Sequence, residues 1–591
     1  MNISILAALF YFVAYVGAVS GIYKIKKSNK KLYGITWGAV SIVGMNCFQV
    51  FVAAILNLIH IPVNCVSIGV FELAVGVVCW YEIIKKKQVQ SHCYDWSDAL
   101  FTVVLLGVVV LFSYQRYGLD LSIHYLTIDP AEHLKMAMNV VTNQNVDRMF
   151  YGALTNAMLI EFLGAFKNPA QYYQIFVLGD ILNLLLAGWM FFGVIRRFCK
   201  DNFLKLGSIV ITIIYLLAYP LNNTIFGFVY LGMGVTIIAY LIIVVDEFMR
   251  GNLNKWINIV LISAGCLGIF ECYVLFMPVT FFAILTCVLV KQYQAKKLFS
   301  VDTVITGLSI FLVPCIIGLL YTYMGFFGSE GGQTVGSAIV SEGGIYRDLY
   351  SNFLFVMPFA LLGFWNLVKE KKNRLLLFLI PFLGVFVLSL FIRGMKGTVS
   401  SYYYYKNYYL LWLLVFILAF QGISSIAGKA RVLIVCFLGI WIFNAGIFAT
   451  RIETRIQNKN SLFCVNQKAG AYLDIYSFNR DAKALPPYPW EKVQLYQYAV
   501  TELLEKDEVK PVPIAGYWED AYWMEAITNQ RLSGFDYWNN GDELFFSNLE
   551  EKAEYVIVLK DSEFYASYQE YFDSMERVYE NTYGFIGKVK K

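Results

Sequence analysis

One polar stretch between two apolar runs is rich in side chains that can exchange protons. It holds two of the chain's four histidines, His124 and His133. Three acids, Asp120, Asp129 and Glu132, stand in the same stretch. Carboxylates and imidazoles placed beside a reacting hydroxyl act as general acids and bases. We therefore predict catalytic roles for Asp129, Glu132 and His133, and substrate contacts for Asp120 and His124.

The same oxygen-rich stretch suits a divalent cation such as Mg²⁺ or Mn²⁺, because these ions prefer carboxylate oxygens. Sites of this kind have no diagnostic spacing, so a bound metal is a candidate cofactor and its ligands stay open. No Cys/His group in the sequence has the ligand spacing of a zinc site.

A helix is predicted to position these groups. Pro130 suits the first turn of a helix, and Asp129 suits its N-cap. Glu132 follows Asp129 by three residues, as in a capping box. A helix over 130–142 would carry an apolar stripe that lies on the membrane and is formed by Leu134, Met138 and Val141. Asp129 then has two interpretations, a helix cap or a functional carboxylate held at the outer mouth of a bundle.

Composition places these groups in a membrane protein. The 591 residues are 58% hydrophobic and 15% charged, with a mean hydropathy of +0.57. The apolar residues fall in runs of about 17–25, the length that crosses the hydrocarbon layer as a helix. The sequence predicts a mainly α, polytopic bundle of about fourteen spans. The predicted spans are 3–22, 33–59, 62–84, 98–115, 171–195, 203–220, 225–246, 255–271, 273–290, 303–323, 351–368, 375–392, 404–421 and 432–449.

Basic residues orient these spans. The net charge is +5, and the cations gather in loops that follow alternate spans, which indicates membrane topology and not nucleic-acid binding. The rule that cytoplasmic loops are positive places the loops 116–170, 324–350 and 393–403 outside, together with the tail. Counting 150–166 as a span would reverse everything that follows, so we interpret it as a juxtamembrane helix near the outer face.

The tail changes character at about residue 451, where charge, Pro and Asn replace the apolar runs. Short strand-like runs at 512–517 and 555–560 alternate with helix-like runs, which predicts a small extracytoplasmic α/β domain. The predicted domains are N-terminal transmembrane helices, a transmembrane core with the outer loop 116–170, and this tail. Their bounds are 1–97, 98–450 and 451–591.

Cations on the predicted outer side are candidates for holding a phosphate. Arg393, Lys396 and Lys406 flank a Tyr-rich run, and Arg347 lies in the loop 324–350. The alternative for Arg393 and Lys406 is that they are ordinary anchors at the membrane surface. Glu271 is predicted at an outer turn and is a further candidate for substrate contact. Interior pairing explains Asp180 and Glu72 within spans as well as function does.

The architecture and the polar stretch together resemble the GT-C glycosyltransferases. Asp129, Ala131, His133 and Ala137 match a D-x-A-x-H-x-x-x-A pattern that is common in bacterial members. Tyr151-Gly152 and Arg196-Arg197 match two later landmarks of the family, and the resemblance covers about 98–450. It implies transfer of a sugar from a polyprenyl-phosphate donor to a cell-envelope glycan or glycopolymer, with Asp129 as the catalytic acid.

Two alternatives accompany this interpretation. A cell-surface polysaccharide polymerase or ligase would use the same kind of donor at the same face. A flippase or transporter of lipid-linked oligosaccharides would carry its acids along a path through the membrane, where a transferase carries them at the outer mouth.

Overall fold

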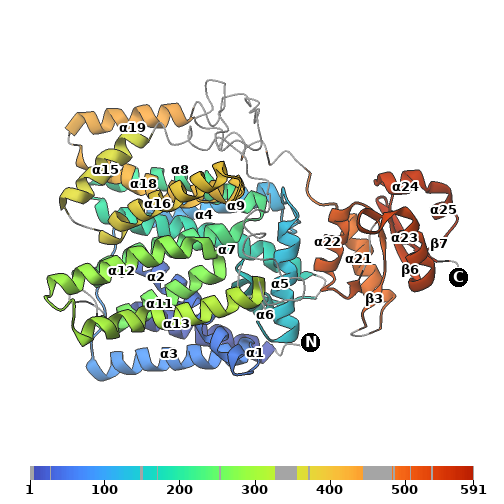
Figure 1. The fold of residues 1–591 in the computed structure, drawn as a ribbon, viewed down its shortest axis with the longest axis horizontal. Helices are drawn as coiled ribbons and strands as arrows, with labels where there is room; N and C mark the ends of the chain where they lie inside the picture. Colours follow the sequence, from blue (N-terminus) through green and yellow to red (C-terminus); the bar gives the residue numbers. More distant parts are fainter. Residues whose placement is uncertain are drawn as a thin grey trace.

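A computed structural model provides the fold. It describes residues 5–26, 28, 30–146, 151–168, 171–251, 254–326, 356–370, 373–426, 428–443, 479, 482, 486–505, 508–533 and 537–589. Twelve helical segments within these ranges are long and apolar enough to cross a membrane. The predicted polytopic helical bundle is therefore confirmed (Figure 1).

Most spanning segments are single helices. They are α1 (Ile5–Lys24), α2 (Gly34–Leu58), α3 (Cys65–Lys86), α4 (Trp96–Tyr117), α7 (Tyr172–Ile195), α10 (Val229–Arg250), α11 (Lys255–Cys272), α12 (Met277–Gln294), α13 (Val301–Phe326) and α16 (Arg374–Met395). Two further segments are each built from two consecutive helices. One comprises α8 (Asn202–Leu216) and α9 (Tyr219–Phe226), and the other comprises α17 (Ser401–Lys406) and α18 (Tyr408–Ser425).

Two of the fourteen predicted spans do not reach this length within the described residues. The spans 351–368 and 432–449 correspond to α15 (Met357–Glu370) and α19 (Gly428–Phe443), of 14 and 16 residues. At 1.5 Å per residue these helices are about 21 and 24 Å long, short of the roughly 30 Å hydrocarbon layer. Parts of both predicted ranges lie outside the described residues, so their crossing stays a prediction.

The bundle is arranged around α10. Nearly all residues of α10 are buried, and its sequence is apolar all round, as expected for a helix enclosed by other helices. In contrast, α1, α3 and α4 bury only one side and lie at the edge of the bundle. The three N-terminal spans are thus packed onto the bundle mainly through α2, which contacts both α7 and α11.

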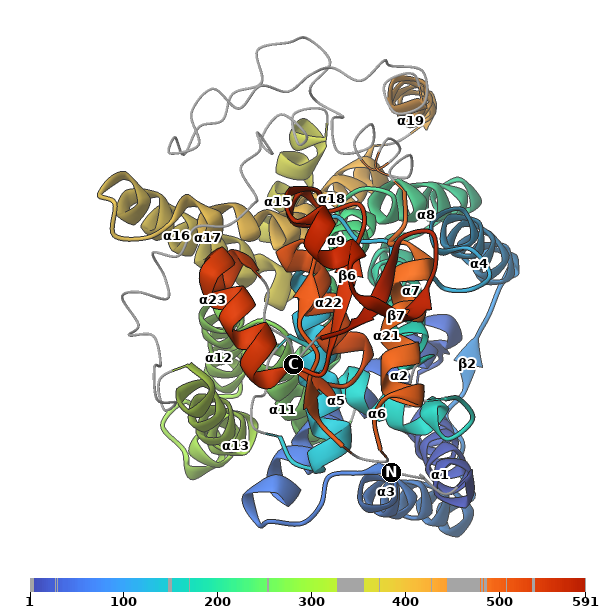
Figure 2. The ribbon, with the colours of Figure 1, turned by 90° about the vertical axis from the view of Figure 1, so that its right-hand side faces the viewer.

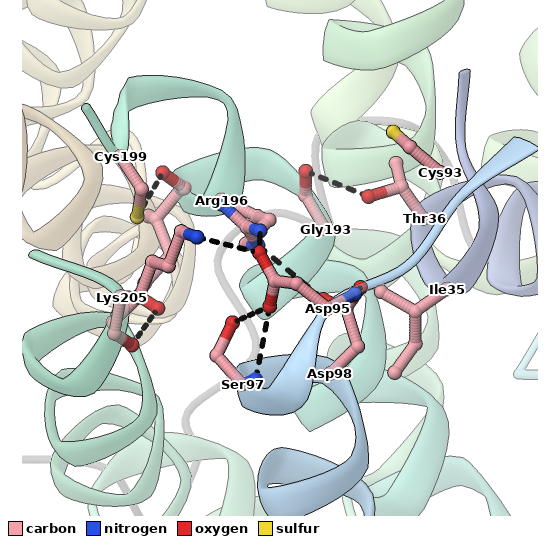
Figure 3. A network of polar contacts seen from close by, with 12 residues as sticks. Ile35, Thr36, Cys93, Asp95, Ser97, Asp98, Gly193, Arg196, Cys199 and Lys205 are labelled. Carbon is pink, nitrogen blue, oxygen red and sulfur yellow. Dashed lines mark hydrogen bonds and ion pairs between the residues drawn. The ribbon is translucent and has the colours of Figure 1, made fainter. Parts of the chain in front are cut away.

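A network of ion pairs at one end of the bundle joins the start of α4 to the turn after α7 and to α8 (Figure 3). Asp95 caps α4 through Ser97 and pairs with both Arg196 and Lys205, the latter at 2.9 Å. Arg196 also contacts Asp98 at 3.3 Å. Burial alone would raise the pKa of Asp95, but hydrogen bonds from Ser97 and Lys205 and the charge of Arg196 lower it to about 2. The Arg-Arg landmark therefore ties helix ends together.

The opposite end of the bundle carries two short helices, α5 (Asp129–Asn143) and α6 (Ala153–Gly164). Figure 1 shows both between the spans and the C-terminal domain. The 12 residues of α6 extend about 18 Å, too short to cross a membrane. This length agrees with the prediction that 150–166 is not a span.

The tail forms the predicted small α/β domain. Its four-stranded sheet has the order β4-β6-β8-β7, with β4 (Ile514–Ala515) parallel to β6 (Tyr555–Leu559). The strands β7 (Glu576–Glu580) and β8 (Gly584–Lys588) complete it in antiparallel pairing. The predicted strand runs 512–517 and 555–560 contain β4 and β6. The helices of this domain are α21 (Trp490–Glu502), α22 (Trp518–Ile527), α23 (Tyr537–Lys552), α24 (Glu563–Ser567) and α25 (Gln569–Asp573).

Two short parallel strand pairs complete the described elements. One joins β1 (Leu32–Tyr33) to β2 (His92–Cys93) beside the N-terminal spans. The other joins β3 (Lys510–Pro511) to β5 (Leu532–Ser533) in the C-terminal domain.

Candidate functional site

Asp129 is the first residue of α5. The N-cap position is Ile128, whose φ of −87° and ψ of −15° are already helical, and no side chain caps this helix end. The prediction that Asp129 is the N-cap, and forms a capping box with Glu132, is therefore wrong by one residue. Glu132 instead pairs with Lys135 at 2.5 Å. The Asp129 carboxylate is thus not used to hold its own helix.

The start of α5 is fixed against the turn that connects α9 to α10. Leu126 N–H donates to the Ile225 carbonyl at 3.0 Å, and the Thr127 hydroxyl donates to the Phe226 carbonyl at 2.7 Å. Gly227 has a φ of +81°, and a Cβ on it would lie 1.9 Å from Cγ of Pro130. Glycine is required there by both backbone conformation and space. This contact holds Asp129 against the bundle.

Lys406 is buried within an aromatic cage. Lys406 is the last residue of α17, just before α18 begins, and it is 4% exposed. Its Nζ donates to the Tyr230 hydroxyl at 2.9 Å. The same Nζ lies 4.1 Å from the ring centre of Tyr402 and about 5.5 Å from those of Phe228, Tyr230 and Tyr273. A surface anchor would extend to water, so this burial argues against the anchor interpretation.

Asp129 and Lys406 interact electrostatically. Burial raises the pKa of the half-buried Asp129 above its ordinary value, and the charge of Glu132 adds to this, whereas the charge of Lys406 opposes it. A carboxylate whose pKa is raised holds a proton more strongly and is a better base. A proton acceptor thus lies within electrostatic reach of a buried amine.

His133 lies one turn after Asp129 on α5 and is buried. Its ring packs against those of Tyr151 and Tyr230, with centres 5.2 and 5.1 Å away. Burial lowers the pKa of His133 to about 3, and the charge of Lys406 acts in the same direction, while a hydrogen bond to the Gly227 carbonyl opposes both. The imidazole is therefore neutral near pH 7, which fits positioning of the neighbouring rings better than proton donation.

Two other residues predicted to contact substrate, Asp120 and His124, make hydrogen bonds to residues other than Asp129 and Lys406. The side chain of Asp120 is exposed, and its carbonyl accepts a hydrogen bond from Gln174 at 2.9 Å. His124 is buried, with Nδ1 2.6 Å from the Arg116 carbonyl. These contacts indicate that His124 holds the loop between α4 and α5 in place.

Glu271 is buried at the end of α11 and accepts from the backbone N–H groups of Leu154 and Thr155 at 3.2 and 3.3 Å. It thereby satisfies N–H groups in the first turn of α6, a role that the sequence did not indicate. Among the other cations, Arg393 and Lys396 are exposed at the end of α16, and Arg347 lies outside the described residues.

The two acids within spans are held by polar side chains. Asp180 accepts from the Tyr125 hydroxyl at 2.6 Å, and Glu72 accepts from Gln49 at 2.6 Å. A cavity of about 310 Å³ between α1, α2, α6 and α7 is lined in part by Gln49, and Asp129 is not among its lining residues. The Asp129 cluster thus lies apart from this intramembrane cavity.

A metal has little support from the arrangement of donors. Within the described ranges no three His, Cys, Asp or Glu side chains converge as a ligand set. The Asp129 and Glu132 carboxylates stand one turn apart, and Glu132 is occupied by Lys135. The candidate Mg²⁺ or Mn²⁺ cofactor stays a sequence-based expectation, and the chemistry below uses the protein side chains alone.

Sequence reasoning missed most of the cage. Phe228 and Tyr230 lie at the start of α10, and Tyr273 lies between α11 and the 3-10 turn that follows it, and nothing in their local sequence marks them. Tyr402 belongs to the Tyr-rich run that Arg393, Lys396 and Lys406 flank. Only the density of tyrosine in that run could have pointed to it.

No protein-family model matches the chain, and no curated protein does. Comparison with solved structures finds ArnT from Cupriavidus metallidurans bound to undecaprenyl phosphate, with 10% identity and a TM-score of 0.46 over 83% of this chain and 97% of that one. ArnT in the apo state gives the same values. The Archaeoglobus fulgidus oligosaccharyltransferase in the apo form has 10% identity and a TM-score of 0.42 over 79% of this chain and 70% of that one. At this identity no residue role is carried over.

Proposed function

We propose that the chain is a GT-C-type membrane glycosyltransferase. It moves a sugar from a polyprenyl-phosphate-linked donor to a cell-envelope glycan or glycopolymer at the outer face of the membrane. The observation that carries this proposal is the pair formed by Asp129, which caps no helix, and Lys406, which is buried in an aromatic cage.

The pair supplies what such a transfer requires. An acceptor hydroxyl attacks the anomeric carbon, and Asp129 takes the hydroxyl proton as the new C–O bond forms. The bond from the anomeric carbon to the phosphate oxygen breaks, and its electrons leave with the lipid phosphate. Lys406 stabilises the negative charge that grows on this leaving group, and its burial strengthens the interaction because little water screens it.

The position of the pair favours a transferase over the alternatives. The cluster lies at the end of the bundle that carries the C-terminal domain (Figure 1). Transport through the membrane would require accessible charges along a path, whereas Asp180 and Glu72 are buried and hydrogen-bonded to Tyr125 and Gln49. A polymerase or ligase would share the donor and this site, so the acceptor decides between these two activities.

The proposal includes a membrane topology that follows from the distribution of basic residues. The positive-inside rule places the start of α5, the cage and the C-terminal domain on the outer side, where a lipid-linked sugar would be presented to envelope polymers. The ion-paired end at Asp95 and Arg196 is then cytoplasmic.

The test is transfer by purified protein in nanodiscs. Undecaprenyl phosphate esters of glucose, galactose, mannose and N-acetylglucosamine serve as donors, with teichoic-acid chains and soluble glycan strands as acceptors. We expect sugar transfer from at least one donor, and a loss of about 10²-fold or more in Asp129→Asn, because positioned bases contribute about 10²–10⁴. Asn keeps the size of the side chain, so the melting temperature should stay within about 1 °C of the parent, as expected for a change worth a few tenths of a kcal/mol. Near-parent transfer by Asp129→Asn would overturn the assignment of the base.

A further inference from the structure

Helix α22 of the C-terminal domain lies along the side of α5 that faces away from the bundle (Figures 1 and 2). Lys135 on α5 pairs with Glu525 on α22 at 3.1 Å. Just past the end of α22, the side-chain amide of Asn529 donates to the Thr142 hydroxyl near the end of α5 at 2.8 Å. The residue numbers of both partners rise from the first contact to the second, so the two helices run parallel. Their N-terminal ends therefore lie side by side.

One face of α22 makes these contacts. Its members follow the spacing of neighbours on a helix and are Trp518, Tyr522 and Glu525. Lys135 lies 4.8 Å from the ring centre of Tyr522. Trp518 stands one turn before Tyr522 on the same face. The parallel alignment therefore places Trp518 beside the first turn of α5, where Asp129 stands.

Trp518 differs from the rest of this face because it is open to solvent. It is 38% exposed, and Tyr522 holds its ring in an edge-on contact, with centres 5.6 Å apart at 89°. On the α5 side, the Glu132 side chain is also 38% exposed while it pairs with Lys135. A series of contacts through Tyr522 and Lys135 thus joins the indole to the partly exposed, ion-paired carboxylate of Glu132, one turn from Asp129.

We propose that Trp518 and Glu132 form a sugar-binding subsite beside Asp129. One face of a pyranose ring is lined by C–H groups and packs on an indole, and the sugar hydroxyls donate to a carboxylate, so an aromatic ring next to an acid suits this ligand. This subsite rests on the proposed glycosyl transfer and adds that the C-terminal domain takes part in sugar recognition. Both the donor sugar and a glycan acceptor present this chemistry.

The experiment compares full-length variants in nanodiscs, using the donors and soluble glycan strands described above. Trp518→Leu keeps the apolar bulk but removes the ring face, and Trp518→Phe keeps a ring. Trp490→Leu, at another exposed tryptophan of the same domain, is the matched control. We expect Trp518→Leu to raise KM for one substrate about tenfold, equal to about 1.4 kcal/mol. We also expect kcat to change less than about twofold, the pattern of lost uniform binding, and Trp518→Phe to recover most of the affinity.

The outcomes separate the subsite from the proposed function. A higher KM for the donor or for the acceptor supports the subsite and identifies which sugar it holds, and unchanged KM values for both overturn it. Saturation-transfer NMR with methyl glycosides of the four donor sugars provides a readout that does not need turnover. The parent could show no transfer but give a saturation-transfer signal from a bound sugar. If Trp518→Leu and Glu132→Gln both lose that signal, the subsite stands and the transferase proposal falls. If the parent shows neither transfer nor saturation, both fall.

Discussion

Replacing Lys406 with Met should remove most sugar transfer and leave the fold intact. The Lys406 side chain is 4% exposed, donates to Tyr230 at 2.9 Å and lies 4.1 Å from the Tyr402 ring. Loss of one preorganised donor to a developing negative charge costs about 10²–10³ in kcat, or about 2.7–4 kcal/mol. Met has a similar length and no charge to bury, and its thioether packs favourably against aromatic rings such as those of this cage. The melting temperature should therefore not fall.

The same variant should move the pH dependence in a defined direction. The charge of Lys406 holds the pKa of Asp129 down against burial and against the charge of Glu132. Without that charge the pKa of Asp129 rises. A base is active when ionised, so the rate falls as pH drops through its pKa, and in Lys406→Met this acidic limb shifts to higher pH.

The assay is kcat/KM against pH for the parent, Lys406→Met and Lys406→Arg in nanodiscs with the undecaprenyl-phosphate donor. Arg keeps the charge, but its planar fork does not reproduce a compact ammonium in this cage, so we expect partial activity and an acidic limb close to that of the parent. If Lys406→Met retains the parent rate and an unmoved acidic limb, Lys406 neither stabilises the leaving phosphate nor influences Asp129, and the reasoning fails.

Three further predictions concern how the site is held. Gly227→Ala should lower both the melting temperature and transfer, because its positive φ and the contact with Pro130 exclude a Cβ; parent-like values in thermal unfolding and activity assays would contradict this. Lys135→Ala and Glu525→Ala should be non-additive in a double-mutant cycle of unfolding, with coupling of about 0.5 kcal/mol or more, since the two side chains are in contact; additive losses would show that the contact contributes nothing. Asn168→Cys should react with a membrane-impermeant thiol reagent added to intact cells, and labelling only after permeabilisation would mean that α6 or its neighbours cross the membrane.

Hydropathy predicts most of the fold because the bilayer leaves few choices for backbone polar groups. Twelve predicted spans have counterparts within the described residues, with ends shifted by a few positions. The largest shift occurs where the predicted span 203–220 continues as α9 to Phe226 after a break at Ala218. Hydropathy does not predict such a break, because it depends on the backbone conformation of Ala218 and on Pro220.

The site was predictable only in part. Asp129 and Lys406 each stood out as a charge near an expected membrane surface, but nothing local indicates that they act on each other across 277 residues of chain. The prediction that Asp129 is the N-cap failed because Ile128 already has helical backbone angles. The following residue pair, Asp129-Pro130, is held in place by the close packing of Pro130 on Gly227. The Trp518 face is recognisable only when α22 is laid against α5, since tertiary contacts and not sequence spacing bring the two helices together.

The contact between α5 and α22 bears on how the protein is made. Lys135 and Glu525 are separated by 390 residues, so α5 is synthesised long before the helix that covers it. On the proposed topology, the ribosome must finish the last spans and the tail must be exported before α22 reaches α5. Until then the outer side of α5 stays uncovered, and Trp518 is not yet in place beside Asp129. Export of the C-terminal domain is thus the final step of active-site assembly, and a chain halted at the last span would reside in the membrane without a complete sugar site.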